Sequence, residues 1–194
     1  MIKIQDLSFG YKQNTPILQN FNLELQKGEL LAVMGASGCG KSTLLQLLAG
    51  FLSPTSGSIQ TDAKKISFDF QEPRLFPWLT VRENLKTVLD KEGDASKIQK
   101  ALQFVELEDA EPLYPDQLSG GMQSRVSLAR SLLYGGDLFL LDEPFSALDE
   151  ALAKSLSQKL RNTLKERNAT AILVTHQTDV AEIFADRVLH MKQL

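Results

Sequence analysis

The 194-residue chain is long enough for one hydrophobic core and short for two, so we expect a single domain, with any second lobe inserted into it. Its 21 lysines and arginines against 24 aspartates and glutamates give a net charge of −3, which argues against a nucleic-acid partner. The only cysteine, Cys39, cannot form an internal disulfide, and the start MIKIQDLSFG lacks the basic-then-apolar pattern of a signal peptide. Since no apolar run is long enough to cross a bilayer, we expect an intracellular protein that reaches membranes only through a partner.

Apolar and polar residues alternate in two early segments, 2–5 and 17–30, which predicts a small antiparallel sheet at the N-terminus. Three short apolar runs follow at 30–33, 138–141 and 171–174. They are interleaved with helical patterns, as buried parallel strands are in α/β proteins. The sequence therefore predicts an α/β core.

A leucine at every fourth position predicts one long helix. Its members are Leu148, Leu152, Leu156, Leu160 and Leu164. Residues 73–134 differ, because they contain a helical stripe and no strand run. That stripe consists of Ile98, Ala101, Leu102 and Val105. We expect one domain over 1–194, in which residues 1–72 and 135–194 form the core and 73–134 form an inserted helical subdomain.

Residues 35–42, GASGCGKS, fit the phosphate-loop pattern G-x-x-x-x-G-K-S/T between an apolar strand and the helical run KSTLLQLLAG. The glycines let backbone N–H groups point at an anion, and the helix N-terminus adds partial positive charge. We expect Lys41 to contact the β- and γ-phosphates of a nucleotide and Ser42 to bind Mg²⁺, with Thr43 in the helix wall. A chance glycine-rich turn is the alternative. The loop comprises Gly35, Ala36, Ser37, Gly38, Cys39, Gly40, Lys41, Ser42 and Thr43.

Polar residues follow the later apolar runs, at the strand ends where open α/β sheets bind ligands. Asp142 suits a contact to Mg²⁺, and Glu143 is the candidate base for the attacking water. His176 ends the next run and is placed to reach the γ-phosphate, while Gln71 offers a carbonyl to Mg²⁺ or to the water. The alternatives are a capping pair, a structural histidine and a solvated glutamine.

Two residues have less context. Cys39 lies inside the phosphate loop, so redox control is conceivable, but the simpler interpretation is a small loop residue without a role of its own. His190 stands outside any motif, and we interpret it as structural.

Six motifs in this order resemble the ATP-binding cassette (ABC) ATPase family, and the resemblance covers nearly the whole chain. They are GASGCGKST, Gln71 in FQEP, LSGGM, LFLLDEP, SALD at 146–149, and His176. The resemblance implies an α/β fold: a RecA-like P-loop NTPase core with a mostly parallel sheet, a small N-terminal antiparallel β subdomain and an inserted helical subdomain. It also implies Mg²⁺-dependent ATP hydrolysis coupled to transmembrane transport.

The same resemblance explains the second glycine-rich helix start, LSGGM at 118–122. Ser119 is suited to be an N-cap, and Gly120 and Gly121 expose N–H groups ahead of an amphipathic helix. In the family this signature closes over ATP held by another subunit, so two nucleotides lie between two chains. The alternative is an ordinary capped helix. The family most often has glutamine at Met122, and the departure leaves Ser119 and Gly121 as γ-phosphate donors.

By resemblance, two further residues belong to the nucleotide site. Tyr11 is similar to the aromatic that stacks on adenine, with a strand-surface tyrosine as the alternative. Asp149 is similar to the residue that links the two sites across the dimer, and it also suits the N-cap of the leucine helix.

The segment EPRLFPWLTVREN after Gln71 brings Leu75, Phe76, Trp78 and Leu79 close together. It is either a partner surface or packing under the helical subdomain. In transporters of the family it receives a helix from a membrane-spanning permease. The resemblance thus implies a cytoplasmic subunit, peripheral on the inner face of the membrane, in an importer for nitrate, sulfonates, taurine or related solutes. A solute-binding protein would act only through the permease.

Other classes remain open. A non-transport ABC ATPase with soluble or nucleic-acid partners normally carries a coiled-coil insertion or two cassettes. Another P-loop enzyme would have to explain LSGGM and lacks an N-K-x-D run, and a scaffold with a dead site would have lost Lys41, Asp142 or Glu143. Many relatives continue beyond the point matching Leu194, so we do not expect regulation through a C-terminal extension, and the support of the last strand is in doubt.

Overall fold

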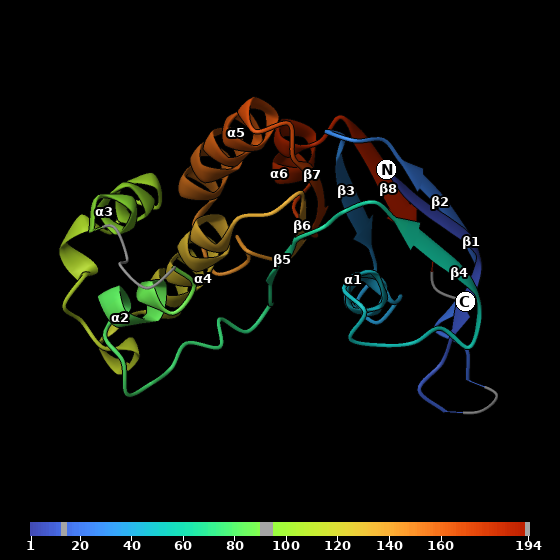
Figure 1. Cartoon of the computed structure of the whole chain (residues 1–194), viewed down its shortest axis with the longest axis horizontal. Helices are drawn as coiled ribbons and strands as arrows, with labels where there is room; N and C mark the ends of the chain where they lie inside the picture. Colours follow the sequence, from blue (N-terminus) through green and yellow to red (C-terminus); the bar gives the residue numbers. More distant parts are fainter. Residues whose placement is uncertain (13–14, 90–94, 193–194) are drawn as a thin grey trace.

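The computed structural model describes residues 1–12, 15–89 and 95–192. They form a three-stranded antiparallel sheet of order β2-β1-β4 and a five-stranded parallel sheet of order β5-β6-β7-β3-β8 (Figure 1). The antiparallel strands are β1 (Ile2–Phe9), β2 (Leu18–Leu25) and β4 (Ser56–Thr61). The parallel strands are β3 (Leu30–Gly35), β5 (Ile66–Asp69), β6 (Leu138–Asp142), β7 (Thr170–Val174) and β8 (Arg187–Met191). The predicted antiparallel sheet and the three predicted parallel strands are confirmed.

Helices cover both faces of the parallel sheet. One of them, α1 (Lys41–Leu48), packs between the two sheets. The other helices are α2 (Val81–Lys86), α3 (Ala95–Phe104), α4 (Gly120–Tyr134), α5 (Glu150–Glu166) and α6 (Thr178–Phe184), with short 3₁₀ turns at Glu108–Ala110 and Pro115–Gln117. In Figure 1, α2 and α3 lie at one end of the molecule and the antiparallel sheet lies at the other. Within the described ranges, no helix is long and apolar enough to cross a membrane.

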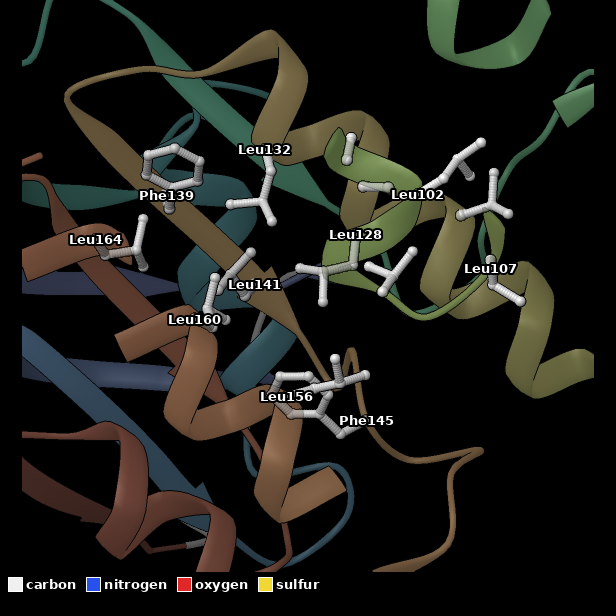
Figure 2. Packing of buried hydrophobic residues seen from close by; sticks show 14 of the residues in the cluster. Leu102, Leu107, Leu128, Leu132, Phe139, Leu141, Phe145, Leu156, Leu160 and Leu164 are labelled. Atoms are coloured by element: carbon white, nitrogen blue, oxygen red, sulfur yellow. The ribbon is translucent and has the colours of Figure 1, made fainter. Parts of the chain in front are cut away.

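The alternation of the strands divides the interior into two large apolar clusters. Phe139 and Leu141 of β6 face the helices α4 and α5, where they meet Leu160 (Figure 2). Leu138 and Leu140 face the opposite way, toward α1 and the antiparallel sheet. Because side chains alternate across a strand, a run that is apolar at every position is buried on both faces. Burial on both faces holds β6 in place, and with it the strand end that carries Asp142.

The leucine stripe forms most of helix α5. Leu156, Leu160 and Leu164 are fully buried, whereas Leu148 and Leu152 are half-buried. Leu148 lies before the helix, because Asp149 is the N-cap and the first helical residue is Glu150. The predicted helix is therefore confirmed, with a start two residues later than the stripe suggests.

The segment 73–134 is helical, and its described residues contain no strand. The predicted stripe is buried as expected, and its members are Ile98, Ala101, Leu102 and Val105. Helix α4 also packs on the parallel sheet, where Ser67 Oγ donates to Ser131 O at 2.8 Å. The division of the domain at residues 73 and 134 stays a prediction.

The last strand is supported along its length. β8 pairs in parallel with β3 from Arg187 opposite Leu31 to Met191 opposite Gly35. Arg187 Nε also donates to Glu29 Oε1 at 2.9 Å. Our doubt about the support of this strand was therefore wrong.

Candidate nucleotide-binding site

The phosphate loop connects β3 to α1, as predicted. Gly38 and Gly40 have φ angles of +80° and +98°, which non-glycine residues adopt only with strain. At Gly40 a Cβ atom would also lie 2.8 Å from Ile17 Cγ2. Gly40 is the N-cap of α1, and a glycine has no side chain that could cap the helix. Backbone N–H groups of the first turn are therefore left for an anion.

Lys41 is held over this loop by the loop's own carbonyl groups. Its Nζ donates to Gly35 O at 2.8 Å and to Ala36 O at 2.9 Å, and the side chain is buried. An ammonium group has three donors, so these two bonds leave one for a phosphate oxygen. The side chain is thus positioned before any nucleotide arrives.

A pocket of about 510 Å³ opens beside the loop, within the usual size range of small-molecule sites. It gathers four predicted residues that are far apart in the sequence and belong to different segments: Tyr11, Gln71, Glu143 and His176. The loop residues that line it are Gly35, Ser37, Gly38, Gly40, Lys41, Ser42 and Thr43. The topology therefore brings the predicted set together at one edge of the parallel sheet.

Cys39 belongs to the same loop, but its side chain lies in the core. It is 3 % exposed and packs in the cluster beneath the loop. Its Sγ is 2.8 Å from the position that a Cβ on Gly35 would take. This burial supports the simpler interpretation, a small packing residue.

Asp142 ends β6 as a buried carboxylate. Its Oδ1 has no hydrogen-bond partner among the described residues. Burial raises the pKa of Asp142, and the charge of Glu143 raises it further, while Ser42 and Lys41 lower it. Since an unpartnered buried carboxylate oxygen is costly, this atom fits a cation that approaches with its own hydration shell. Asp142 and Ser42 are thus suitable residues to hold Mg²⁺, with the exposed Gln71 at the rim of the pocket.

Glu143 lies beside Asp142 but faces the pocket. Its backbone φ of +50° is uncommon for a residue other than glycine. Its N–H donates to Val174 O at 3.0 Å. Glu143 Oε2 lies 3.2 Å from His176 Nδ1. The strained turn therefore places the carboxylate in the pocket beside the histidine, and its role as the base for water stays a prediction.

Tyr11 stands at the mouth of the pocket with most of its ring exposed. Phe9 packs edge-on against the Tyr11 ring, with 5.1 Å between the ring centroids. The Tyr11 hydroxyl lies 3.4 Å from Thr43 Oγ1. An exposed aromatic ring at the edge of a phosphate pocket is available for stacking on a base. Its role in nucleotide binding stays a prediction.

The second glycine-rich start lies outside this pocket. Ser119 is the N-cap of α4, and its Oγ accepts a hydrogen bond from Met122 N at 3.2 Å. Gly121 packs closely on the neighbouring loop, because a Cβ there would be 2.8 Å from Ala147 O. Gly120 has open space around it. The chain therefore has an exposed helix start, at Ser119–Gly121, that does not line its own nucleotide pocket.

Asp149 is the N-cap of α5, because its Oδ1 accepts a hydrogen bond from Leu152 N at 3.0 Å. The predicted capping role is confirmed, and a role in linking two ATP sites stays a prediction.

Sequence reasoning missed a buried polar pair beside Gln71. Ser127 of α4 donates to the carboxylate of Asp69, which is 1 % exposed at the end of β5. Burial raises the pKa of Asp69 to about 7, and Ser127 and Arg130 only partly oppose the shift. The acidic residue within the mostly apolar run ISFDF, at 66–70, was the available signal.

Asp69→Asn is expected to make the stability of the protein less dependent on pH. The pKa of Asp69 is about 7 in the folded chain and about 3.8 in the unfolded chain, so folding binds a proton between these values. This group's contribution to the free energy of unfolding therefore falls as pH rises from about 4 to about 7. Urea unfolding should show that the free energy of unfolding decreases between pH 5 and pH 8. The decrease should be larger by a few kcal/mol in the native chain than in the variant, since one pKa unit corresponds to roughly 1.4 kcal/mol. Equal losses in both proteins would contradict the assignment.

A phosphate loop between a buried strand and a helix, facing carboxylates at the ends of neighbouring parallel strands, defines a P-loop nucleoside triphosphatase. The model of the ABC transporter family matches residues 18–146, and the chain belongs to that family. Both the fold class and the family resemblance predicted from the sequence are confirmed.

Named relatives and solved structures agree with this membership. The aliphatic sulfonates import ATP-binding protein SsuB of Bacillus licheniformis is 41% identical over 197 residues, covering 96% of this chain and 77% of that protein. The bicarbonate transport ATP-binding protein CmpC of Synechococcus elongatus is 41% identical over 186 residues, covering 89% of this chain and 28% of that protein. Among solved structures, the dimeric ATP-binding cassette MJ0796 in a post-hydrolysis state with ADP and Pi has a TM-score of 0.89 and 32% identity, covering 99% of this chain and 94% of that one.

Proposed function

We propose that the chain is the ATP-binding and ATP-hydrolysing subunit of a transporter that imports a small solute through a separate membrane permease. The observation that carries the proposal is the convergence of the Lys41 loop with Gln71, Glu143 and His176 in one pocket, beside the buried carboxylate of Asp142. The names of the relatives, import and transport ATP-binding proteins, support the coupling to transport.

The residues of the pocket have distinct tasks in hydrolysis. Lys41 and the loop N–H groups hold the phosphates, and Glu143 accepts the proton of the attacking water. His176 orients the Glu143 carboxylate through the contact at 3.2 Å. Mg²⁺, held by Ser42 and Asp142 with help from Gln71, would neutralise charge on the β- and γ-phosphates.

A second copy of the chain completes each site. Ser119, Gly120 and Gly121 present an exposed helix start, where N–H groups and partial positive charge favour an anion. We infer that this helix start binds the γ-phosphate of the ATP held by the partner chain, and that Asp149 lies between the two sites. The dimeric state of the solved relative supports this arrangement.

An apolar surface after Gln71 is suited to the permease. Phe76 and Trp78 are 40% and 70% exposed, and their ring centroids lie 5.6 Å apart. Leu75 instead packs against the core, so the packing alternative is right for it. Asn84 fixes the loop, accepting from Phe76 N at 2.8 Å and donating to Phe76 O at 3.1 Å. Two ordered, exposed aromatic rings are typical anchors of an interface.

The cargo passes through the permease and not through this chain. The two named relatives serve aliphatic sulfonates and bicarbonate, both small anions. We propose a small oxyanion of this kind as the solute, delivered to the permease by a solute-binding protein. The ATPase would then be peripheral on the cytoplasmic face of the membrane.

The proposal predicts that the Glu143→Gln chain with ATP captures a multi-spanning permease from detergent-solubilised native membranes. The substitution should preserve the ATP-bound form by blocking hydrolysis. Mass spectrometry should identify the permease, and Trp78→Ala should abolish its recovery because an exposed anchor is lost. Tyr114→Ala, which removes an exposed aromatic outside the Phe76–Trp78 segment, is the control. Recovery of soluble partners alone would favour the non-transport alternative.

A further inference from the structure

We propose that Arg130 of helix α4 is a positioning residue for Gln71. Arg130 is not among the residues that line the pocket. It holds the backbone on which Gln71 is carried, and it does so from the same helix that begins at Ser119. The inference rests on the proposed role of Gln71 in the ATP site.

The segment after Gln71 is attached to Arg130 by two hydrogen bonds. Arg130 Nη2 donates to Pro73 O at 2.7 Å, and Nη1 donates to Arg74 O at 3.1 Å. Arg74 has a φ of +46°, a strained conformation that persists only where the surroundings hold it. A guanidinium group presents its donors in a rigid fork, so it can hold two successive carbonyl groups at once.

The segment is also closed onto itself around Gln71. The guanidinium group of Arg74 lies 4.0 Å from the centroid of the Phe70 ring, and Phe70 immediately precedes Gln71. This cation–π contact joins the two sides of the turn. Gln71 thus sits in a short loop whose shape depends on Arg74, and therefore on the bonds that Arg130 makes.

Helix α4 holds the strand before Gln71 as well. Ser127 donates to the buried carboxylate of Asp69, and Ser131 O accepts from Ser67 Oγ at 2.8 Å. The contacts at Ser127, Arg130 and Ser131 fall on about one turn of the helix. The helix therefore holds the chain on both sides of Gln71, so α4 sets the position of this loop on the sheet.

This attachment connects two different ATP sites in the proposed dimer. Arg130 lies about 16 Å along α4 from Ser119, at 1.5 Å rise per residue. Ser119 faces the ATP of the partner chain in the proposed function, whereas Gln71 faces the ATP of its own chain. Arg130 therefore joins the helix that faces the partner's ATP to the loop that faces the ATP of its own chain.

The test compares steady-state ATP hydrolysis of the purified chain with four variants: Arg130→Met, Gln71→Ala, the double variant, and Arg125→Met. Arg125 is the matched control, because it lies on the same helix and donates to two backbone carbonyls, Val105 O at 2.8 Å and Glu106 O at 2.9 Å, away from Gln71. Arg130→Met should lower kcat about tenfold with KM for ATP within about twofold, since misplacing a positioning group costs turnover. Arg125→Met should leave kcat within about twofold of the native chain.

The double variant separates positioning from general destabilisation. If Arg130 acts through Gln71, Arg130→Met should cause little further loss in the Gln71→Ala background. An equal factor in both backgrounds, or unchanged kcat in Arg130→Met, would overturn the inference. Arg130→Lys, which retains the charge but not the fork, should show the same loss and serves if the methionine variant does not fold. A native chain without ATPase activity would instead remove the proposed function.

Discussion

Glu143→Gln is expected to bind ATP as the native chain does and to hydrolyse it about 10²–10⁴ times more slowly, the usual contribution of a positioned general base. An amide cannot accept the proton of the attacking water. Lys41 is held by Gly35 O and Ala36 O and does not depend on the changed atom for its position. The substitution also retains side-chain length at a position with a φ of +50°, so the strain of the turn is unchanged.

Steady-state phosphate release and equilibrium titration with ATP measure the two quantities separately. Glu24→Gln, which removes an exposed carboxylate from β2 on the other sheet, is the control and should leave both unchanged. Near-normal turnover in the Glu143 variant would remove Glu143 as the base. Weakened ATP binding with unchanged kcat would assign the carboxylate to the phosphate cradle instead.

The parts of the site that the sequence predicts are those built from local patterns. The spacing of the glycines between a strand and a helix predicts the loop at 35–43, and both the strand and the helix form. Asp142 and His176 follow apolar runs, and parallel strands end at one edge of a sheet, so their proximity follows from fold class alone. Tyr11 reaches the pocket from the segment just after β1 of the other sheet, which the family resemblance predicted and periodicity could not.

The parts that could not be predicted depend on contacts between distant segments. Asp69 and Ser127 are 58 residues apart, and nothing in either local pattern indicates that they pair. The same is true of Arg130, whose charge in an amphipathic helix is typical of a solvated face until its partners at 73 and 74 are known. The role of Ser119 has a further limit, since in the proposed dimer its ligand belongs to another chain.

Lys41→Ala is expected to weaken ATP binding itself, in contrast to Glu143→Gln. A charge-assisted hydrogen bond contributes roughly 1.5–3 kcal/mol, and tenfold in affinity corresponds to about 1.4 kcal/mol, so the dissociation constant should rise about 10- to 100-fold. The substitution also leaves Gly35 O and Ala36 O without the donor that joins them, which loosens the cradle around the phosphates.

The measurement is an equilibrium titration with ATP and Mg²⁺ of the Lys41→Ala chain against the native chain. Lys159→Ala is the matched control, because it removes one cation from the surface of α5, where Lys159 pairs with Glu106. Its ATP affinity should equal that of the native chain, so a loss confined to Lys41 excludes a general effect of charge. Unchanged affinity in the Lys41 variant would argue against the loop as the phosphate site. The contrast between Lys41→Ala and Glu143→Gln is the sharper result. A loss of ATP affinity at Lys41 and a loss of turnover at Glu143 are expected together only if different residues of the pocket bind the phosphates and accept the proton.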